Sequence, residues 1–298
     1  MGSIQRPNAV NQSTYSKSQL NTIRIYKDRA SYDYTAVHSV FASTFVSHVA
    51  FITSDEDGTP TPMNLPMTAV LGYYDPEDPI PDDDGTEAQY CRQQEDFNRP
   101  MDVYLHGNAA MMLRRAVTHN GAVKVCLTST KVDGVVLHFT PNGHSLNYRS
   151  AVIHGTAEMV TSQQEKEYAM HMLTNHMIRR RWSSVSKVSP QAMKSVQIVK
   201  VVVRSASAKI RAKNMGIAKP AELGTRDDVY TGVIPLYEVL GEPIDSGYFP
   251  ERPVQPHLEH WIAERNQTQK DYAVSAAQLS EEDVEQIRRS RNPEIGKS

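Results

Sequence analysis

Seven short segments rich in β-branched and aromatic residues constrain the fold of this chain more than any other feature. Turn-forming Gly, Asp, Asn and Pro separate them, and only a few helical patterns intervene. A series of antiparallel strands tends to close, or nearly close, into a barrel, because closure removes exposed strand edges. We therefore predict a mainly β (α+β) fold with flanking helices. The predicted strands are 45–53, 63–73, 101–106, 122–130, 135–139, 146–160 and 196–204.

Turn signals and apolar periodicity fix how these strands are connected. The sequence Asp-Glu-Asp-Gly at 55–58 predicts a hairpin turn, and Asp133-Gly134 predicts a second one. Gly155 interrupts the strand 146–160 and predicts a kink or bulge. Apolar residues at helical spacing predict helices at 33–43, 108–119, 165–177, 256–273 and 281–291.

Composition suggests three regions along the 298 residues. Residues 1–30 are polar and aperiodic, which predicts a flexible N-terminal arm. Residues 31–223 hold the predicted strands and form the barrel domain. Within them, 75–100 carries nine acids and four prolines and predicts an exposed acidic loop. Residues 224–298 predict a tail whose helices pack on the barrel or on a partner subunit.

Several classes of protein are disfavoured by the sequence. No stretch approaches the roughly 18 apolar residues of a membrane span, and the first residues lack the apolar core of a signal peptide. Only two cysteines are present, Cys91 and Cys126, too few for a disulfide framework. The histidines form no set with carboxylates or cysteines that would bind a metal. We therefore expect a cytoplasmic protein with no metal site and no membrane partner.

The charge distribution is uneven although the net charge is only −2. Residues 168–221 carry eleven Lys or Arg and no Asp or Glu. Such a stretch produces positive potential, which suits either an anionic small ligand or a solvated basic face. No nucleic-acid-binding motif accompanies the charge, so we expect no nucleic-acid partner.

Three local patterns contain candidate ligand-binding residues. His106, Gly107 and Asn108 form a strand-to-helix turn, where the amides at a helix N-terminus suit an anion. On the strand 146–160, Arg149 is flanked by hydrogen-bonding side chains; its guanidinium suits a phosphate or a surface ion pair. Lys209 and Arg211 share one face of a basic strand and serve either a bound anion or solvent.

Taken together, these segments resemble the pyridoxamine 5′-phosphate oxidase-related flavin-nucleotide-binding proteins of fungi and bacteria, to which the nitroimidazole-resistance proteins are related. The resemblance covers about residues 33 to 275 in consistent order. It is carried by DEDGTPTPMNLPM, YLHG, VDGVVLHFTPNGHSLNYRSAVIHGTAEMV, SASAKIRA and VYTGVIP.

The resemblance implies an FMN-binding split β-barrel, usually a homodimer whose flavin lies in a groove between subunits. It implies that the strand 61–67 lies along the isoalloxazine ring and that His106 lies near the ribityl phosphate. His106 and His144 are the candidate proton-transfer residues, since imidazole titrates near neutral pH. The expected cofactor-binding residues are Asn64, Leu65, Met67, His106, Gly107, Asn108, Asn147, Tyr148, Arg149, Ser150, Lys209 and Arg211.

One departure from the family pattern bears on function. Family members commonly carry a Ser-Arg or Ser-Ser-Arg element after the His-Gly pair, whereas this chain has Ala109-Ala110-Met111-Met112. Each charge-assisted hydrogen bond contributes roughly 1.5–3 kcal/mol, so losing two weakens phosphate binding considerably.

Two hypotheses of function follow. The first is an FMN-dependent oxidoreductase that acts on a small organic molecule. The second is a flavin-independent isomerase, cyclase or lyase of a biosynthetic pathway on the same barrel, with a haem-binding variant as a further alternative.

Overall fold

The computed structural model describes residues 13–77, 97–107, 110–216 and 228–291. The elements follow the chain in the order η1 (Lys27–Arg29), β1 (Ala30–Ser31), α1 (Tyr34–Ala42), β2 (Ser47–Ser54), β3 (Pro60–Gly72), β4 (Asp102–His106), α3 (Ala110–Asn120), β5 (Val123–Leu137), η2 (Pro141–Gly143), β6 (Ser145–Met159), α4 (Gln163–Met177), α5 (Arg181–Ser184), α6 (Pro190–Ser195), β7 (Val199–Arg211), β8 (Gly232–Pro235), α7 (Pro256–Ala276) and α8 (Glu281–Arg291).

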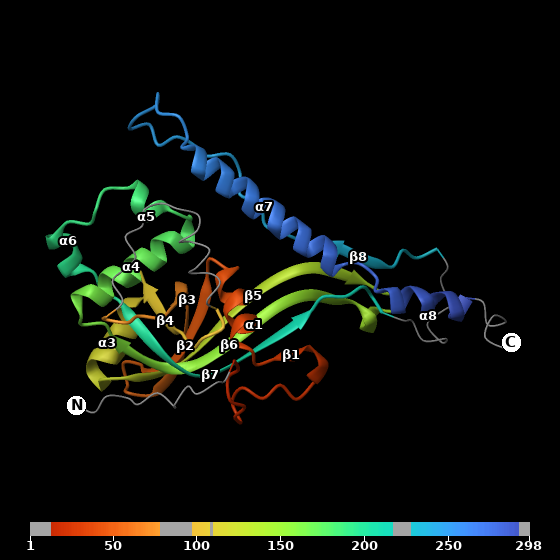
Figure 1. The fold of residues 1–298 in the computed structure, drawn as a ribbon. Helices are drawn as coiled ribbons and strands as arrows, with labels where there is room; N and C mark the ends of the chain where they lie inside the picture. Colours follow the sequence, from red (N-terminus) through yellow and green to blue (C-terminus); the bar gives the residue numbers. More distant parts are fainter. Residues whose placement is uncertain (1–12, 78–96, 108–109, 217–227, 292–298) are drawn as a thin grey trace. The chain divides into compact units, whose positions relative to one another are not determined.

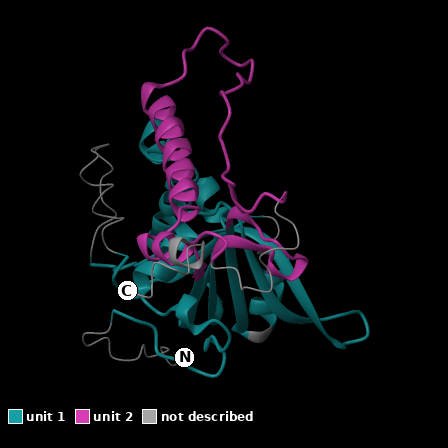
Figure 2. Cartoon of the chain, turned by 90° about the vertical axis from the view of Figure 1, so that its right-hand side faces the viewer, with its two compact units in different colours: residues 1–131, 150–209 teal, residues 132–149, 210–298 magenta. Residues whose placement is uncertain are grey.

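The chain divides into two compact units (Figure 2). Unit 1 consists of Met1–Lys131 and Ser150–Lys209, and unit 2 of Val132–Arg149 and Ile210–Ser298. Each of the strands β5, β6 and β7 begins in one unit and ends in the other. The hairpin 132–149 therefore groups with the tail, whereas the sequence assigned it to the barrel domain. The expected boundary after residue 223 lies outside the described residues.

The sheet closes on itself (Figure 1). Its order is β1-β7-β4-β3-β2-β5-β6, and β6 also pairs with β7. Gly155 allows this last approach, because a Cβ there would lie 2.5 Å from Val201 Cγ1 and 2.6 Å from the Val202 carbonyl oxygen. β6 runs unbroken through Gly155, so the glycine serves a close contact between strands. The predicted mainly β barrel with flanking helices is confirmed.

The barrel core of unit 1 follows from strand alternation. Every second residue is buried from Ser47 to Phe51 of β2 and in the first half of β5, as a strand with one face on the core requires. Val49, Leu105, Leu127, Ile153 and Val201 are fully buried and come from five different strands. One apolar cluster therefore fills the barrel.

The first predicted hairpin turn is confirmed. β2 and β3 pair with Ser54 opposite Pro60. The Asp55 carboxylate accepts hydrogen bonds from the Asp57 and Thr59 amides at 3.0 and 2.8 Å, and Gly58 adopts φ 78°. The acidic side chain and the glycine thus form the turn together.

The second predicted turn is wrong. Asp133 and Gly134 lie within the single continuous strand β5, and the chain reverses at η2 instead. A Cβ on Gly134 would lie 2.9 Å from Val233 Cγ1, so the glycine allows β8 to pair closely with β5. The Asp133 side chain is buried in an ion pair, which removes it from the solvent position of a turn.

The described part of the predicted flexible arm packs on the barrel. Tyr15 is buried, and its backbone N–H donates to the Tyr32 carbonyl at 2.8 Å. The Asn21 side chain is buried as well and donates to the Ala206 carbonyl at 2.9 Å. The described part of this segment therefore has buried side chains that contact the barrel; whether the arm is flexible stays a prediction. Most of the acidic loop 75–100 lies outside the described residues.

The five predicted helices are confirmed within a few residues as α1, α3, α4, α7 and α8. The helix α8 is capped by Ser280, whose Oγ accepts a hydrogen bond from the Asp283 amide at 3.0 Å. The helix α6 was missed although its signal is present. Ser189 Oγ accepts from the Ala192 amide at 3.2 Å, and Pro190 occupies the first turn.

Candidate functional site

The strand β3 has an open edge over half of its length. Its residues 60–67 pair with β2, but β4 pairs only with 68–72, because β4 ends at His106 opposite Thr68. Among the described strands, none pairs with 60–67 on the β4 side. Pro60, Pro62 and Pro66 have no N–H, so this edge offers a planar polar ligand mainly backbone carbonyl acceptors, with N–H donors only where the residue is not proline.

Asn64, Leu65 and Met67, which the resemblance places at a flavin ring, lie on this open edge. The Asn64 side chain is exposed and Leu65 is half-buried. Met67 packs in the barrel core, with 4% of its surface exposed. Met67 therefore contributes its side chain to the core, and it pairs with Ser47 of β2.

His106 and Gly107 lie at the end of β4, next to this edge. His106 Nδ1 lies 3.1 Å from the Gln197 carbonyl oxygen, which only accepts, so Nδ1 carries the proton. In the neutral ring, Nε2 then keeps a lone pair that can accept a proton. Sequence reasoning missed the orienting role of Gln197, because a backbone carbonyl leaves no signal in the sequence.

Gly107 adopts φ 135°, a conformation that other residues rarely reach. No atom lies within 4 Å of the position a Cβ would take, so the space around it is open. Asn108 and Ala109 lie outside the described residues, and α3 begins at Ala110. The described site thus combines an open strand edge, an oriented imidazole and a glycine at the entry to a helix.

Arg149, one of the expected cofactor-binding residues, forms its contacts within unit 2. Its Nε and Nη2 donate to the two carboxylate oxygens of Asp133 at 3.0 and 2.7 Å. Its guanidinium carbon lies 3.7 Å from the centre of the Tyr272 ring. Burial raises the pKa of Tyr272, and the nearby Arg149 charge opposes that shift.

Asn147 and Arg211 form a second buried group in unit 2. Asn147 Nδ2 donates to the Ala276 carbonyl at 3.0 Å, and its Oδ1 accepts from Arg211. Arg211 also donates to the carbonyls of Lys213 and Asn214, both at 3.1 Å. These contacts hold the C-terminal end of α7 against the hairpin strands. A phosphate role for Asn147, Arg149 and Arg211 stays a prediction.

The other predicted residues are more dispersed. Ser150 Oγ donates to the Lys209 carbonyl at 3.1 Å in unit 1, and Lys209 Nζ lies 5.6 Å from the Tyr26 ring. Tyr148 is half-buried on β6. His144 is exposed in unit 2, with Nδ1 3.0 Å from the Thr140 carbonyl oxygen. The structure therefore brings the β3 residues together with His106 and Gly107, and groups Asn147, Arg149 and Arg211 separately.

Among the described residues, no group of three or more His, Cys, Asp or Glu side chains is placed to hold a metal ion. None of the described helices combines the length and hydrophobicity needed to cross a membrane.

Comparison with known proteins agrees with the barrel. Residues 33–210, more than half of the chain, match the model of the family described as pyridoxamine 5′-phosphate oxidase. No curated protein is significantly similar to the chain.

Two solved structures share the fold. The flavocytochrome Anf3 from Azotobacter vinelandii superposes with a TM-score of 0.60 at 21% identity, covering 82% of this chain and 97% of that one. The FAD and haem binding protein from Mycobacterium smegmatis gives 0.59 at 17% identity, covering 78% and 97%. The chain belongs to the pyridoxamine 5′-phosphate oxidase family and has its split-barrel fold.

Proposed function

We propose that this protein is a flavin-dependent oxidoreductase that acts on a small organic molecule, with the flavin ring along the open edge of β3. The open edge beside His106 and Gly107 is the observation that carries the proposal. An isoalloxazine ring is flat, with hydrogen-bonding groups on one rim and apolar methyl groups on the other. The free edge of β3 offers backbone carbonyls in one plane, with few N–H donors because of its prolines, and these carbonyls suit the donor group of such a rim.

The residues at this edge have distinct proposed roles. Backbone groups of 61–67 orient the ring, and half-buried Leu65 contributes apolar contact. His106, held through Nδ1 by Gln197, presents Nε2 as a proton acceptor for a substrate. A bound flavin would supply electron and hydride transfer, and the chain supplies binding and orientation.

A new candidate for the phosphate contact is Arg114 on α3. It is half-buried and makes no ion pair with the described residues. Helix side chains lean toward the N-terminus, so an arginine one turn into α3 can extend back toward its first turn. We propose that Arg114 replaces the guanidinium that this chain lacks after the His-Gly pair.

The identity of the flavin is part of the proposal. The family resemblance implies FMN, whereas the protein from Mycobacterium smegmatis is described as binding FAD. Both carry the isoalloxazine ring and a phosphate at the end of the ribityl chain. Mass spectrometry of flavin released from the purified protein distinguishes them.

The first prediction concerns flavin binding. Purified protein, or protein titrated with FMN and FAD, should show bound-flavin absorption and quenched flavin fluorescence. Arg114→Gln should weaken binding about tenfold or more, because it removes a charge-assisted hydrogen bond. Arg115→Gln, on the exposed neighbour, is the matched control and should bind normally. No binding of either flavin to the unmodified protein would refute the flavin assignment and favour a flavin-independent enzyme.

A second candidate is a protein that binds haem together with flavin. It is favoured because the descriptions of both solved neighbours name a flavin and a haem or cytochrome. The purified protein, and the protein mixed with haemin, would then show a Soret band that shifts on reduction. Absence of such a band after reconstitution would reject this candidate.

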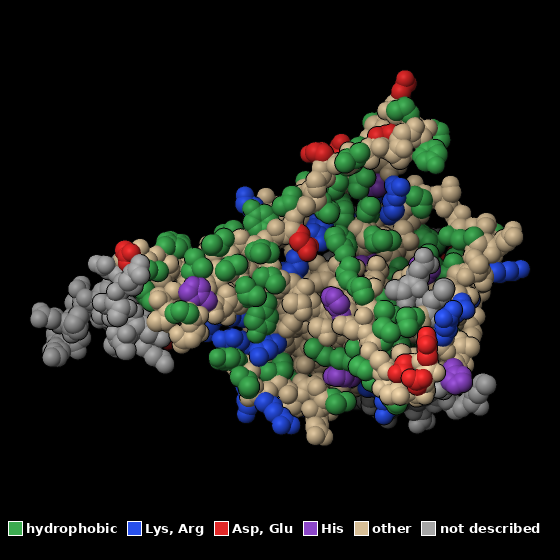
Figure 3. All heavy atoms as spheres, turned by 180° about the vertical axis from the view of Figure 1, so that it is seen from behind, with side chains coloured by type: hydrophobic (Ala, Val, Ile, Leu, Met, Phe, Trp, Pro, Cys, Tyr) green, Lys and Arg blue, Asp and Glu red, His purple; other side chains and the backbone are tan. Residues whose placement is uncertain are grey.

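We also propose that the protein is a homodimer whose interface includes unit 2. Large hydrophobic side chains are exposed at short intervals along its segment 230–249. Hydrophobic side chains also lie open on the face shown in Figure 3. Exposed apolar clusters of this kind mark interaction surfaces. The exposed large hydrophobic residues of the segment 230–249 are Tyr230, Ile234, Leu236, Tyr237, Val239, Ile244, Tyr248 and Phe249.

The second prediction tests this assembly. Light scattering at micromolar concentration should give a mass of about twice 33.4 kDa. Ile234→Asp with Val239→Asp should shift the protein toward monomer, because each carboxylate would have to lose its water in the interface. Val185→Asp, at an exposed apolar position in unit 1, is the control. A monomeric unmodified protein would contradict the proposal.

A further inference from the structure

The segment 16–29, here called the N-terminal loop, is attached to the rest of unit 1 by hydrogen bonds. Buried Asn21 anchors it: its Nδ2 donates to the carbonyls of Ser16 and Ala206 at 3.0 and 2.9 Å. Its Oδ1 accepts from the Ser18 amide at 2.6 Å. The Ile23 amide also donates to the Tyr32 hydroxyl at 3.0 Å. The loop emerges next to β1 as part of the red segment in Figure 1.

The N-terminal loop presents large apolar side chains to water. Leu20 is 71% exposed, Ile25 70% and Tyr26 58%. Tyr26 also adopts the left-handed conformation with φ 55°, which is uncommon for a residue other than glycine. A loop fixed by buried hydrogen bonds could have turned these side chains inward. Their exposure therefore points to a partner that contacts them.

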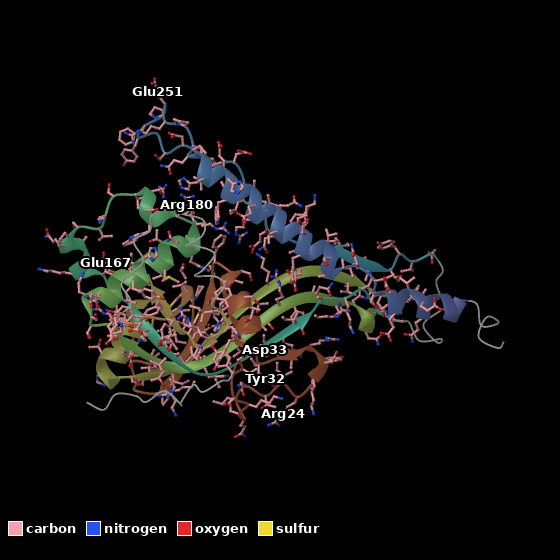
Figure 4. The ribbon with its side chains drawn as sticks, in the orientation of Figure 1. Arg24, Tyr32, Asp33, Glu167, Arg180 and Glu251 are labelled. Atoms are coloured by element: carbon pink, nitrogen blue, oxygen red, sulfur yellow. The ribbon has the colours of Figure 1, made fainter. Side chains whose placement is uncertain are left out.

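Basic side chains surround the apolar ones. Arg24 and Lys27 lie on the loop, and the Arg29 guanidinium carbon lies 4.0 Å from the centre of the Tyr26 ring. Lys209 Nζ approaches the same ring at 5.6 Å from β7. Lys17 Nζ lies 4.7 Å from the centre of the ring of Tyr32, which Figure 4 labels together with Arg24.

These charges are not neutralised within the described part of the chain. None of the five cations forms a salt bridge with a described carboxylate. Asp28 is the only acid in the loop. The surface therefore carries a clear positive excess next to exposed hydrocarbon.

We propose that the N-terminal loop is a membrane-surface anchor that docks on anionic phospholipid bilayers. Leu20 and Ile25 enter the boundary between headgroups and acyl chains, and Tyr26 lies at headgroup level, where aromatic side chains are favoured. Lys17, Arg24, Lys27, Arg29 and Lys209 bind lipid phosphates. Apolar insertion and attraction to anionic headgroups are the two contributions that together bind peripheral proteins to membranes.

A bilayer fits this surface better than a nucleic acid does. Tyr26 would stack on a base, but the aliphatic side chains Leu20 and Ile25 offer no aromatic platform. Among lipid acyl chains, these two aliphatic side chains are removed from water, which is favourable. The sequence expectation of no membrane partner rested on the lack of a spanning segment, which surface docking does not require.

The test is co-sedimentation of the full-length protein with vesicles. Vesicles of phosphatidylcholine mixed with phosphatidylserine should bind the protein, and phosphatidylcholine alone should bind it much less. Added salt should weaken binding, because it screens the attraction between exposed charges. No binding to the anionic vesicles at low salt would overturn the proposal.

Matched variants separate the two contributions. Arg24→Gln with Lys27→Gln should weaken binding about fivefold for each charge removed. Leu20→Ser with Ile25→Ser should leave the salt dependence but reduce affinity. Val185→Ser with Lys187→Gln alters an exposed apolar and an exposed basic residue elsewhere in unit 1 and should bind normally. Equal binding by all three variants would refute the assignment to this loop.

Two further measurements test whether the loop inserts into the bilayer and whether it binds a nucleic acid instead. Ile25→Trp should shift its fluorescence emission to shorter wavelength on adding anionic vesicles, since the indole leaves water; no shift would contradict insertion. A single-stranded oligonucleotide is the competing ligand. If it binds with the same dependence on Arg24 and Lys27 while vesicles do not bind, the loop is a nucleic-acid site and the membrane proposal is wrong.

Discussion

Arg149→Gln is expected to lower the free energy of unfolding by about 3–5 kcal/mol, because it leaves the Asp133 carboxylate buried without its cation. The two side chains are 13% and 3% exposed, so water compensates little. The variant also loses the contact between the guanidinium and Tyr272. Chemical unfolding monitored by circular dichroism measures the change. Arg204→Gln, at an exposed arginine on β7, is the control.

This prediction bears on the phosphate role expected for Arg149. If Arg149→Gln loses flavin, there are two explanations. Either the guanidinium contacts the phosphate directly, or its loss disrupts the hairpin structure. Asp133→Leu with Arg149→Met removes the whole pair and should recover most of the stability, since apolar replacement of a buried ion pair is often neutral or stabilising. If the stable double variant still binds flavin, Arg149 is structural. If it folds but no longer binds flavin, the guanidinium contacts the cofactor.

An unchanged stability of Arg149→Gln would contradict the structural account. It would mean that Asp133 is reached by water or finds another donor. A stable Arg149→Gln that has lost flavin would support the phosphate assignment that the sequence suggested.

The barrel could be predicted because its signals are local. Alternating apolar residues, the Asp55–Gly58 turn and the helical spacing in α1 and α4 each act within a few residues. The wrong turn prediction at Asp133-Gly134 also arose because it relied on a local signal. A turn-forming dipeptide cannot reveal that β8, about a hundred residues later, packs against the glycine and that Arg149 pairs with the aspartate.

The candidate site depends on relations that the sequence does not encode locally. The β3 edge is open because β4 ends opposite Thr68, which is a matter of strand register. Arg149 has the residue type and flanking groups of a phosphate ligand, yet its partner Asp133 is 16 residues away. The family resemblance therefore identified the strand edge, and residue type identified the charged hairpin, but only the fold shows which charges already have partners.

His38 is a further position that the helical pattern could not identify. It lies beside Val37 on α1 and is fully buried, although it is polar. Nδ1 lies 2.9 Å from the Phe97 carbonyl oxygen and must donate, so Nε2 accepts from the Tyr15 hydroxyl at 2.7 Å. Tyr15 comes from the segment expected to be flexible. The neutral imidazole thus connects that segment to α1.

Acidification is therefore expected to destabilise the protein through His38. Burial lowers the pKa of His38 from 6.5 to about 4, and the hydrogen bond to Phe97 opposes this only in part. Between these values the unfolded chain takes up a proton that the folded protein excludes, so stability falls as the pH falls. The contribution of the neutral His38 ring to the free energy of unfolding is fully present above pH 6.5. About 3 kcal/mol of it is lost when the pH falls to 4.

Unfolding of the protein and of His38→Gln across this pH range measures the effect. The unmodified protein should lose about 3 kcal/mol more than the variant between pH 6.5 and pH 4, because glutamine does not titrate. His48→Gln removes an exposed imidazole from β2 and is the matched control. Should His38→Gln fold poorly, an NMR titration of the His38 ring in the unmodified protein gives its pKa directly. A midpoint near 6.5 would show that the buried imidazole accepts a proton within the fold, and the connection between Tyr15 and α1 would then not be the acid-sensitive element.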